Sequence, residues 1–266
     1  MKAAHGTLYI NFILVATMFL FYNKFVKLRI IMLHLVVFLG NPGEKYEHNR
    51  HNAGWILAEA LPFFPVLDWQ KKFKALYANV DSARISLPDD PPTGASPAVL
   101  PAAVPGKMPE KLHFIKPQTY MNHSGEAVLA AALFYKVKLN EIIVVHDEIE
   151  LPFGTLSLKF SGGLGGHNGL RSMKSCFGSP DFWRLRIGIG RPDDRIPGRG
   201  GNPESSRDAG IADWVLSDFT PAEAEALVPV YNAGAGLLLQ ALAAEPEQIM
   251  SQWVKKNCLA EENNDI

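Results

Sequence analysis

Residues 33–43 carry the sequence LHLVVFLGNPG, and this stretch decides the fold. The first eight residues form a short run of aliphatic and β-branched side chains, which is typical of a buried strand. The Gly-Asn-Pro-Gly sequence that follows is a dense turn signal, and it ends the strand at about residue 40. The stretch therefore predicts a buried strand whose neighbours must come from the rest of the chain.

Strands and helices alternate along most of the remaining sequence. Strands are expected at residues 112–116, 142–145 and 183–190, with a strand pair within residues 72–87. Helices are expected at residues 51–61 and 124–135 (with Ser124 as N-cap), from about residue 170, and in residues 221–253, where Pro229 and Pro246 should divide the helical stretch. This alternation predicts a single α/β domain with a mixed, mostly parallel sheet and helices on both faces.

Three segments do not fit this pattern. Residues 1–31 form an N-terminal extension whose uncharged run of residues 8–22 is shorter than the ~20 residues of a membrane-spanning helix. The extension is either a weak membrane anchor or upstream sequence before a start at Met32, and we favour the second because Met32 opens the strand pattern directly. Residues 32–258 are the expected catalytic domain. It contains a proline-rich insertion at about residues 87–109 and a polar, Gly-rich one at 196–209.

Composition excludes several classes of protein. The chain has 266 residues, of which 47% are hydrophobic and 20% charged, so it is globular rather than disordered. Its formal net charge is −1, so any contact with nucleic acid must use a local basic patch. Two cysteines, with no Cys/His pairs at zinc spacing, indicate a reducing compartment rather than a disulfide framework. Because the chain also lacks phosphate-loop, dinucleotide, zinc-protease and serine-elbow motifs, we expect an enzyme with no cofactor, metal or covalent intermediate.

Polar side chains follow the predicted strands at the points where those strands end. In open parallel sheets such positions converge on one crevice. Each residue alone has a structural explanation, such as a turn former for Asn41 or a helix cap for Asp147. Together they offer one proton carrier, one carboxylate and several carboxamides: His51, Asp147, Asn41, Asn122 and Asn168.

Five sequence blocks resemble the bacterial-type peptidyl-tRNA hydrolases, and they occur in that family's order. The blocks are LGNPGEKYEHNRHNAG (39–54), KPQTYMNHSG (116–125), VHDEIELPFG (145–154), GGLGGHNGLR (162–171) and FWRLRIGIGRP (182–192), with VLSDFTPAE (215–223) as a sixth. The sequence departs from the family at Asn49, where Thr is common, in the two insertions, and in the segment before Met32.

The resemblance implies a role for each matching residue. It implies that His51 activates a water molecule, that Asp147 holds and polarises His51, and that Asn41 distinguishes blocked from free aminoacyl ends. It also implies that Asn122 and Asn168 line the substrate crevice, and that Tyr46 and Tyr120 contact the 3′ end of the tRNA. A His–Asp pair suits this reaction because the carboxylate fixes the imidazole tautomer while the imidazole takes a proton near neutral pH.

The tRNA needs phosphate contacts, and one part of the chain is basic. Residues 155–200 contain eight Lys or Arg against three Asp, a local charge of +5. Lys159 and Arg171 flank the glycine cluster and are the favoured phosphate contacts, whereas Arg184 and Arg186 share one strand face and one of them is a candidate structural ion-pair partner.

The leading expectation is a cytoplasmic, monomeric, metal-independent esterase that acts on peptidyl-tRNA and needs no protein partner. Two alternatives remain at this point. One is a hydrolase of another amide or ester, and the other is an RNA-binding protein without catalysis.

Overall fold

The computed structural model describes residues 31–85, 108–192 and 207–259. The chain divides into two compact units, residues 1–31 and 32–266, and the second contains all elements discussed below. The predicted N-terminal extension, the proline-rich insertion at 87–109 and the segment at 196–209 lie outside the described residues, apart from their last residues.

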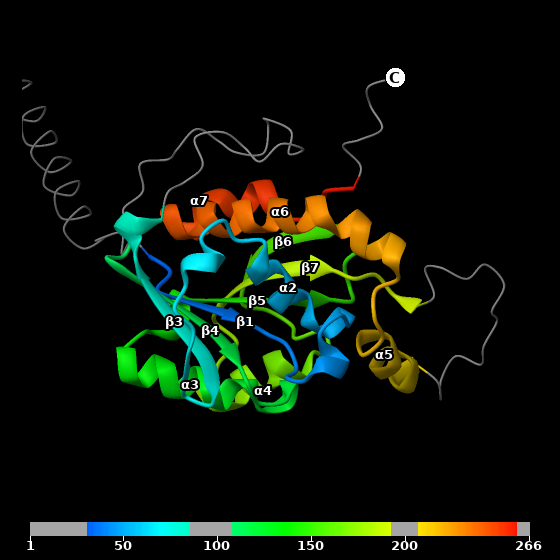
Figure 1. Cartoon of the computed structure of the whole chain (residues 1–266), viewed down its shortest axis with the longest axis horizontal. Coiled ribbons are helices and arrows are strands. Elements are labelled where there is room, and N and C mark those ends of the chain that lie inside the picture. Colours follow the sequence, from blue (N-terminus) through cyan, green and yellow to red (C-terminus); the bar gives the residue numbers. More distant parts are fainter. Residues whose placement is uncertain (1–30, 86–107, 193–206, 260–266) are drawn as a thin grey trace, which may run out of the picture. The chain divides into compact units, whose positions relative to one another are not determined.

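The described residues form one eight-stranded sheet with the order β2-β3-β4-β1-β5-β7-β6-β8 (Figure 1). The four central strands β4, β1, β5 and β7 pair in parallel, and antiparallel strands extend the sheet at both edges. The sheet is therefore mixed, with a parallel centre, and the α/β prediction is confirmed. The strands are β1 (Leu35–Phe38), β2 (Gln70–Lys72), β3 (Ala75–Asp81), β4 (Lys111–Pro117), β5 (Ile142–Glu148), β6 (Thr155–Phe160), β7 (Trp183–Gly188) and β8 (Lys256–Asn257).

Helices cover both faces of the sheet, and strand β1 shows why. Its side chains alternate between two separate cores, so both faces of β1 need an apolar cover. Val36 and Phe38 pack in the core of α2, α6 and α7, whereas Leu35 and Val37 pack in the core of α3 and α4 (Figure 1). The described helices are α2 (Ala53–Glu59), α3 (Ser124–Tyr135), α4 (Asn168–Phe177), α5 (Arg207–Val215), α6 (Pro221–Ala243) and α7 (Pro246–Met250).

Most predicted elements are confirmed, with corrections at their ends. The predicted strand pair is the β2–β3 hairpin, which begins earlier than expected, while β6 and α5 were not predicted. Ser124 is not an N-cap, because a 3-10 turn at Met121–His123 precedes α3 and His123 occupies the cap position. The chain does break at Pro246, which opens α7.

Helix α6 passes through Pro229 without a break, contrary to the sequence-based prediction. A proline inside a helix removes one backbone hydrogen bond and costs ~3 kcal/mol. Burial of Leu227, Val230 and Leu237 against the sheet offsets this cost, since each buried side chain contributes ~1.5–3 kcal/mol. Residues 221–243 are also long and apolar enough to cross a membrane, but 61% of the most apolar window is buried inside the protein, as in a core helix.

Candidate active site

A cleft of about 760 Å³ opens where the parallel strands β1, β4 and β5 end. The topology thus brings together residues that are far apart in the sequence. Eight of the nine predicted site residues line the cleft, and Lys159 does not. The eight are Asn41, Tyr46, His51, Tyr120, Asn122, Asp147, Asn168 and Arg171.

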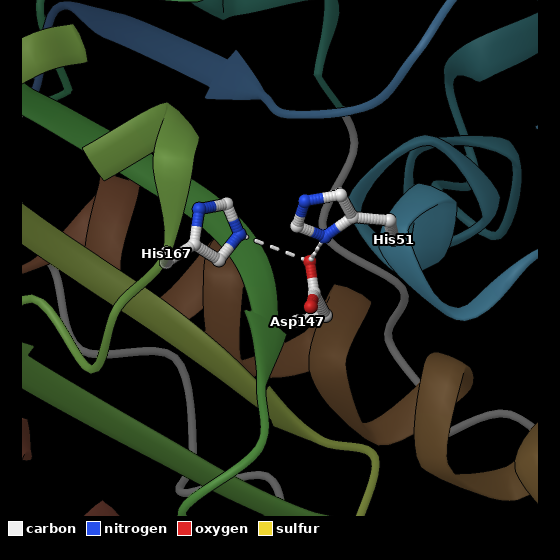
Figure 2. A group of neighbouring side chains, drawn as sticks. All are labelled: His51, Asp147 and His167. Atoms are coloured by element: carbon white, nitrogen blue, oxygen red, sulfur yellow. Dashed lines mark hydrogen bonds and ion pairs between the residues drawn. The ribbon is translucent and has the colours of Figure 1, made fainter. Parts of the chain in front are cut away.

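His51 and Asp147 both line the cleft and are buried. Figure 2 shows the hydrogen bond between them. The Nδ1 atom of His51 lies 2.8 Å from Oδ1 of Asp147. Gly54 permits this approach, because a Cβ at that position would lie 2.6 Å from the Val145 carbonyl and 2.7 Å from the Leu39 carbonyl. The start of α2 can therefore pack directly on β1 and β5, which presents His51 to the end of β5.

A second imidazole, which the sequence analysis did not select, binds the same carboxylate oxygen (Figure 2). The Nε2 atom of His167 lies 3.0 Å from Oδ1 of Asp147. His167 occupies the N-cap of α4, and its Nδ1 accepts hydrogen bonds from the amides of Gly169 at 3.1 Å and Leu170 at 3.4 Å. The only sequence signal for it was the position of His167 directly before Asn168 at the end of the glycine cluster.

The two imidazoles determine the ionisation of Asp147. Burial by itself would raise the pKa of the Asp147 carboxyl, because it removes the charged form from water. The charges and hydrogen bonds of His51 and His167 outweigh burial and hold this pKa well below its usual range. Asp147 is therefore a carboxylate at any pH near neutrality.

The ligand atoms of His51, Asp147 and His167 lie within 4.8 Å of one another, which raises the possibility of a metal site. The hydrogen bonds argue against it. A metal-bound histidine usually donates its second ring N–H to an acceptor. Here Nδ1 of His167 accepts from two backbone amides, so the ring proton is on Nε2 and points at Asp147. The cluster is thus built as a hydrogen-bonded triad.

Asn41 connects the ends of two strands. Its Oδ1 accepts a hydrogen bond from the Met121 amide at 2.8 Å, and its backbone exchanges two hydrogen bonds with the carboxamide of Asn52. These contacts hold the Asn41 side chain in one orientation, with Oδ1 occupied and Nδ2 left as the donor on the cleft side.

Two aromatic rings stand at the cleft mouth, together with two exposed carboxamides. The rings of Tyr46 and Tyr120 meet edge to face with centroids 6.5 Å apart, and Tyr120 is 60% exposed. Asn122 and Asn168 are exposed, at the 3-10 turn before α3 and at the first position of α4. All four can contact a large ligand without displacing protein groups.

Both arginines of β7 have structural partners. The buried Arg184 donates hydrogen bonds to the carbonyls of Gly162 and Gly163 and so fixes the glycine loop. Arg186 pairs with Glu148 at 3.0 Å. One of the two was predicted to be a structural ion-pair partner, and Arg186 is that residue, whereas Arg184 bonds backbone carbonyls.

Helix α5 supplies an apolar wall of the cleft that the sequence analysis missed. The wall consists of Ile211, Ala212, Val215 and Leu216.

Arg50, the residue before His51, anchors this wall. Its guanidinium lies 3.9 Å from the ring centre of Trp214, donates to the Ser217 hydroxyl at 2.8 Å, and pairs with both carboxylate oxygens of Glu223 at 2.9 Å. The wall is thus fixed to the turn that carries His51.

Comparisons with known proteins agree with this site. The family model described as peptidyl-tRNA hydrolase matches residues 35–261. The peptidyl-tRNA hydrolase of Treponema pallidum (strain Nichols) is 41% identical over 233 residues, which cover 86% of this chain and 98% of that protein.

Solved structures show the same fold. A peptidyl-tRNA hydrolase crystallised with N-propanol has a TM-score of 0.55 at 28% identity, over 82% of this chain and 95% of the other. The Acinetobacter baumannii peptidyl-tRNA hydrolase has a TM-score of 0.54 at 29% identity, over 80% and 96%. The fold, the order of the sequence blocks and the relatives agree: the chain belongs to the peptidyl-tRNA hydrolase family and is an ester hydrolase of peptidyl-tRNA.

Proposed function

We propose that His51 is the general base of this reaction and that Asp147 orients it. The observation that carries the proposal is the 2.8 Å contact between Nδ1 of His51 and Oδ1 of Asp147. A carboxylate acceptor there keeps the ring proton on Nδ1, so the lone pair is on Nε2. Among the described residues Nε2 has no hydrogen-bond partner, and His51 lines the cleft, so a water molecule can approach it.

In the proposed reaction Nε2 takes a proton from water while the oxygen attacks the carbonyl carbon of the ester. The tetrahedral intermediate then collapses, the bond to the ribose oxygen breaks, and the imidazolium returns its proton to that leaving oxygen. The anionic Asp147 stabilises the imidazolium while it exists. No metal or covalent intermediate is required.

The carboxamides would bind the peptide part of the substrate. Asn41, Asn122 and Asn168 can each donate and accept a hydrogen bond, which suits a peptide backbone and leaves side chains unread. A donor aimed at the developing oxyanion contributes ~3 kcal/mol to such reactions. For Asn41 we propose a second task, the distinction between a neutral amide and a free ammonium at the amino end of the substrate.

The tRNA part would contact the aromatic and basic groups around the cleft. Tyr46 and Tyr120 offer ring faces and edges for the unpaired 3′ end. Arg171 at the cleft and Lys159 on the neighbouring β6 offer positive charge to phosphates. We further propose that residues 32–258 are the catalytic domain and that the chain acts as a cytoplasmic monomer without an obligatory protein partner. The chain has two cysteines, too few for a disulfide framework, which agrees with a reducing compartment.

The test is release of N-acetylated amino acid from N-acetylaminoacyl-tRNA in the presence of a chelator. The proposal predicts turnover that His51→Ala lowers by ~10²–10⁴ and that the chelator leaves unchanged. Binding of tRNA without turnover would instead indicate an RNA-binding protein. Equal turnover of a free peptide ester would indicate a hydrolase that does not use the tRNA.

A further inference from the structure

The Oδ1 atom of Asp147 is shared by two imidazoles that come from different elements. His51 approaches from the turn before α2, and His167 approaches from the N-cap of α4. Their ring centres are 4.7 Å apart, so both rings lie against the same carboxylate. The mechanism above assigns work to His51 and none to His167.

The backbone of α4 fixes the tautomer of His167. Its Nδ1 accepts from the amides of Gly169 and Leu170, so the ring proton resides on Nε2. A second proton, on Nδ1, would face these two N–H groups and the positive end of the α4 dipole. His167 is therefore built to donate to Asp147 and cannot accept from it.

The other ionisable groups around the triad do not replace this donor. His146 touches the His167 ring edge to face at 4.9 Å, and burial lowers the pKa of His146 well below its ordinary value, so that ring is neutral. Burial and the charge of Asp147 raise the pKa of Tyr231 on α6, so this hydroxyl is neutral. Arg184 on β7 bonds the carbonyls of Gly162 and Gly163. Arg171 on α4 bonds the His167 carbonyl through its backbone amide.

We propose that His167 is a positioning residue for the hydrolysis, an inference that rests on the proposed function of the His51–Asp147 pair. Its Nε2–H group holds the Asp147 carboxylate in the orientation that faces His51. The same hydrogen bond partly neutralises the negative charge on Oδ1, so Asp147 stabilises protonated His51 less strongly than it would without His167.

Two substitutions separate this role from helix capping. His167→Asn keeps an acceptor near the position of Nδ1, and so keeps the cap, but it removes the donor to Asp147. His167→Gln keeps a donor near the position of Nε2 but removes the cap. We expect His167→Asn to melt near the wild-type temperature and His167→Gln to melt at a lower temperature.

The deciding measurement is the pH profile of kcat/KM for N-acetylaminoacyl-tRNA. For His167→Asn the acid midpoint should move up by about one pH unit and kcat near neutral pH should fall about tenfold, since a hydrogen bond to a charged group is lost. For His167→Gln the midpoint should stay at the wild-type value. A wild-type midpoint in His167→Asn, or a raised one in His167→Gln, would overturn the proposal, so either variant alone decides it. Failure of the proposed function would appear differently, as a wild-type kcat in the folded His51→Ala protein.

Discussion

The side chain of Asn41 accepts a hydrogen bond from the backbone amide of Met121 at 2.8 Å, across 80 residues of sequence. A residue needed only for the turn after β1 would not require this contact with the segment after β4. Because the contact occupies Oδ1, the Nδ2 group is the part of Asn41 available to a ligand in the cleft.

Asn41→Asp should therefore change which substrate is preferred. The new carboxylate can still accept from Met121, but it places a charged acceptor where Nδ2 was a donor. Loss of the donor should cost ~1–3 kcal/mol of transition-state binding for peptidyl-tRNA. The carboxylate should attract the free ammonium of unblocked aminoacyl-tRNA, so relative activity on that substrate should rise. The measurement is the ratio of kcat/KM for the two substrates, with a melting curve as control, and an unchanged ratio in a folded variant would return Asn41 to the role of turn former.

Lys159→Ala and Arg171→Ala should each raise KM for the tRNA-linked substrate more than they lower kcat. Phosphate contacts contribute to binding in the ground state and the transition state alike. The wild-type KM should rise with salt, and each variant should show a smaller dependence on salt. Lys138→Ala is the matched control. Lys138 precedes β5, at the end of this strand opposite to the cleft, and it pairs with Glu141. Salt dependence identical to wild type would remove both residues from the phosphate contacts.

Glu223→Ala should destabilise the protein strongly. Glu223 is buried, pairs with Arg50 and accepts a hydrogen bond from the Thr220 amide. Its removal takes the carboxylate away from the buried charge of Arg50. Breaking a buried pair in this way costs ~3–5 kcal/mol. Urea denaturation of Glu223→Ala and of Glu225→Ala, an exposed residue on the same helix, measures the difference. Equal unfolding free energies in the two variants would contradict the anchoring role of the Arg50–Glu223 pair.

Stability should fall between about pH 6.5 and pH 4 because of His113. Burial lowers the pKa of His113 to about 4, assisted by the positive charges around it, and its Nδ1 accepts from the Tyr77 hydroxyl at 2.7 Å. In this range the unfolded chain binds a proton that the folded protein does not, so the unfolding free energy rises with pH. His113→Phe should flatten this dependence, whereas His48→Ala, at an exposed position, should not. Melting temperatures from pH 4 to pH 7 provide the comparison, and parallel curves for wild type and His113→Phe would show that another group is responsible.

The sequence predicted those parts of the fold that depend on local pattern. Strand β1 and residues 142–145 of β5 are uniformly apolar because both faces are buried, and these residues therefore stand out in the sequence. Strand β6 was missed although its residues Thr155–Phe160 alternate between polar and apolar side chains, a pattern that is typical of a strand. The predicted helix break at Pro229 was wrong because sequence alone does not show how much burial supports the helix around this residue.

The site was predictable to a similar degree. Asn41 follows β1, His51 lies in the turn before α2 and Asp147 lies near the end of β5, and the parallel topology brings such positions together. His167 was not selected because its importance depends on a contact with a carboxylate 20 residues away. The α5 wall was missed because its residues follow a polar, Gly-rich stretch, and tertiary contacts such as those of Trp214 with Arg50 and Gly190 give this helix its position.

His51 is the base in the proposed reaction, and its most direct test is the kcat of His51→Ala at saturating N-acetylaminoacyl-tRNA. We expect kcat to fall by ~10²–10⁴, the usual contribution of general-base catalysis, while the Kd for the tRNA stays close to the wild-type value. A wild-type kcat in the folded His51→Ala protein would contradict the account.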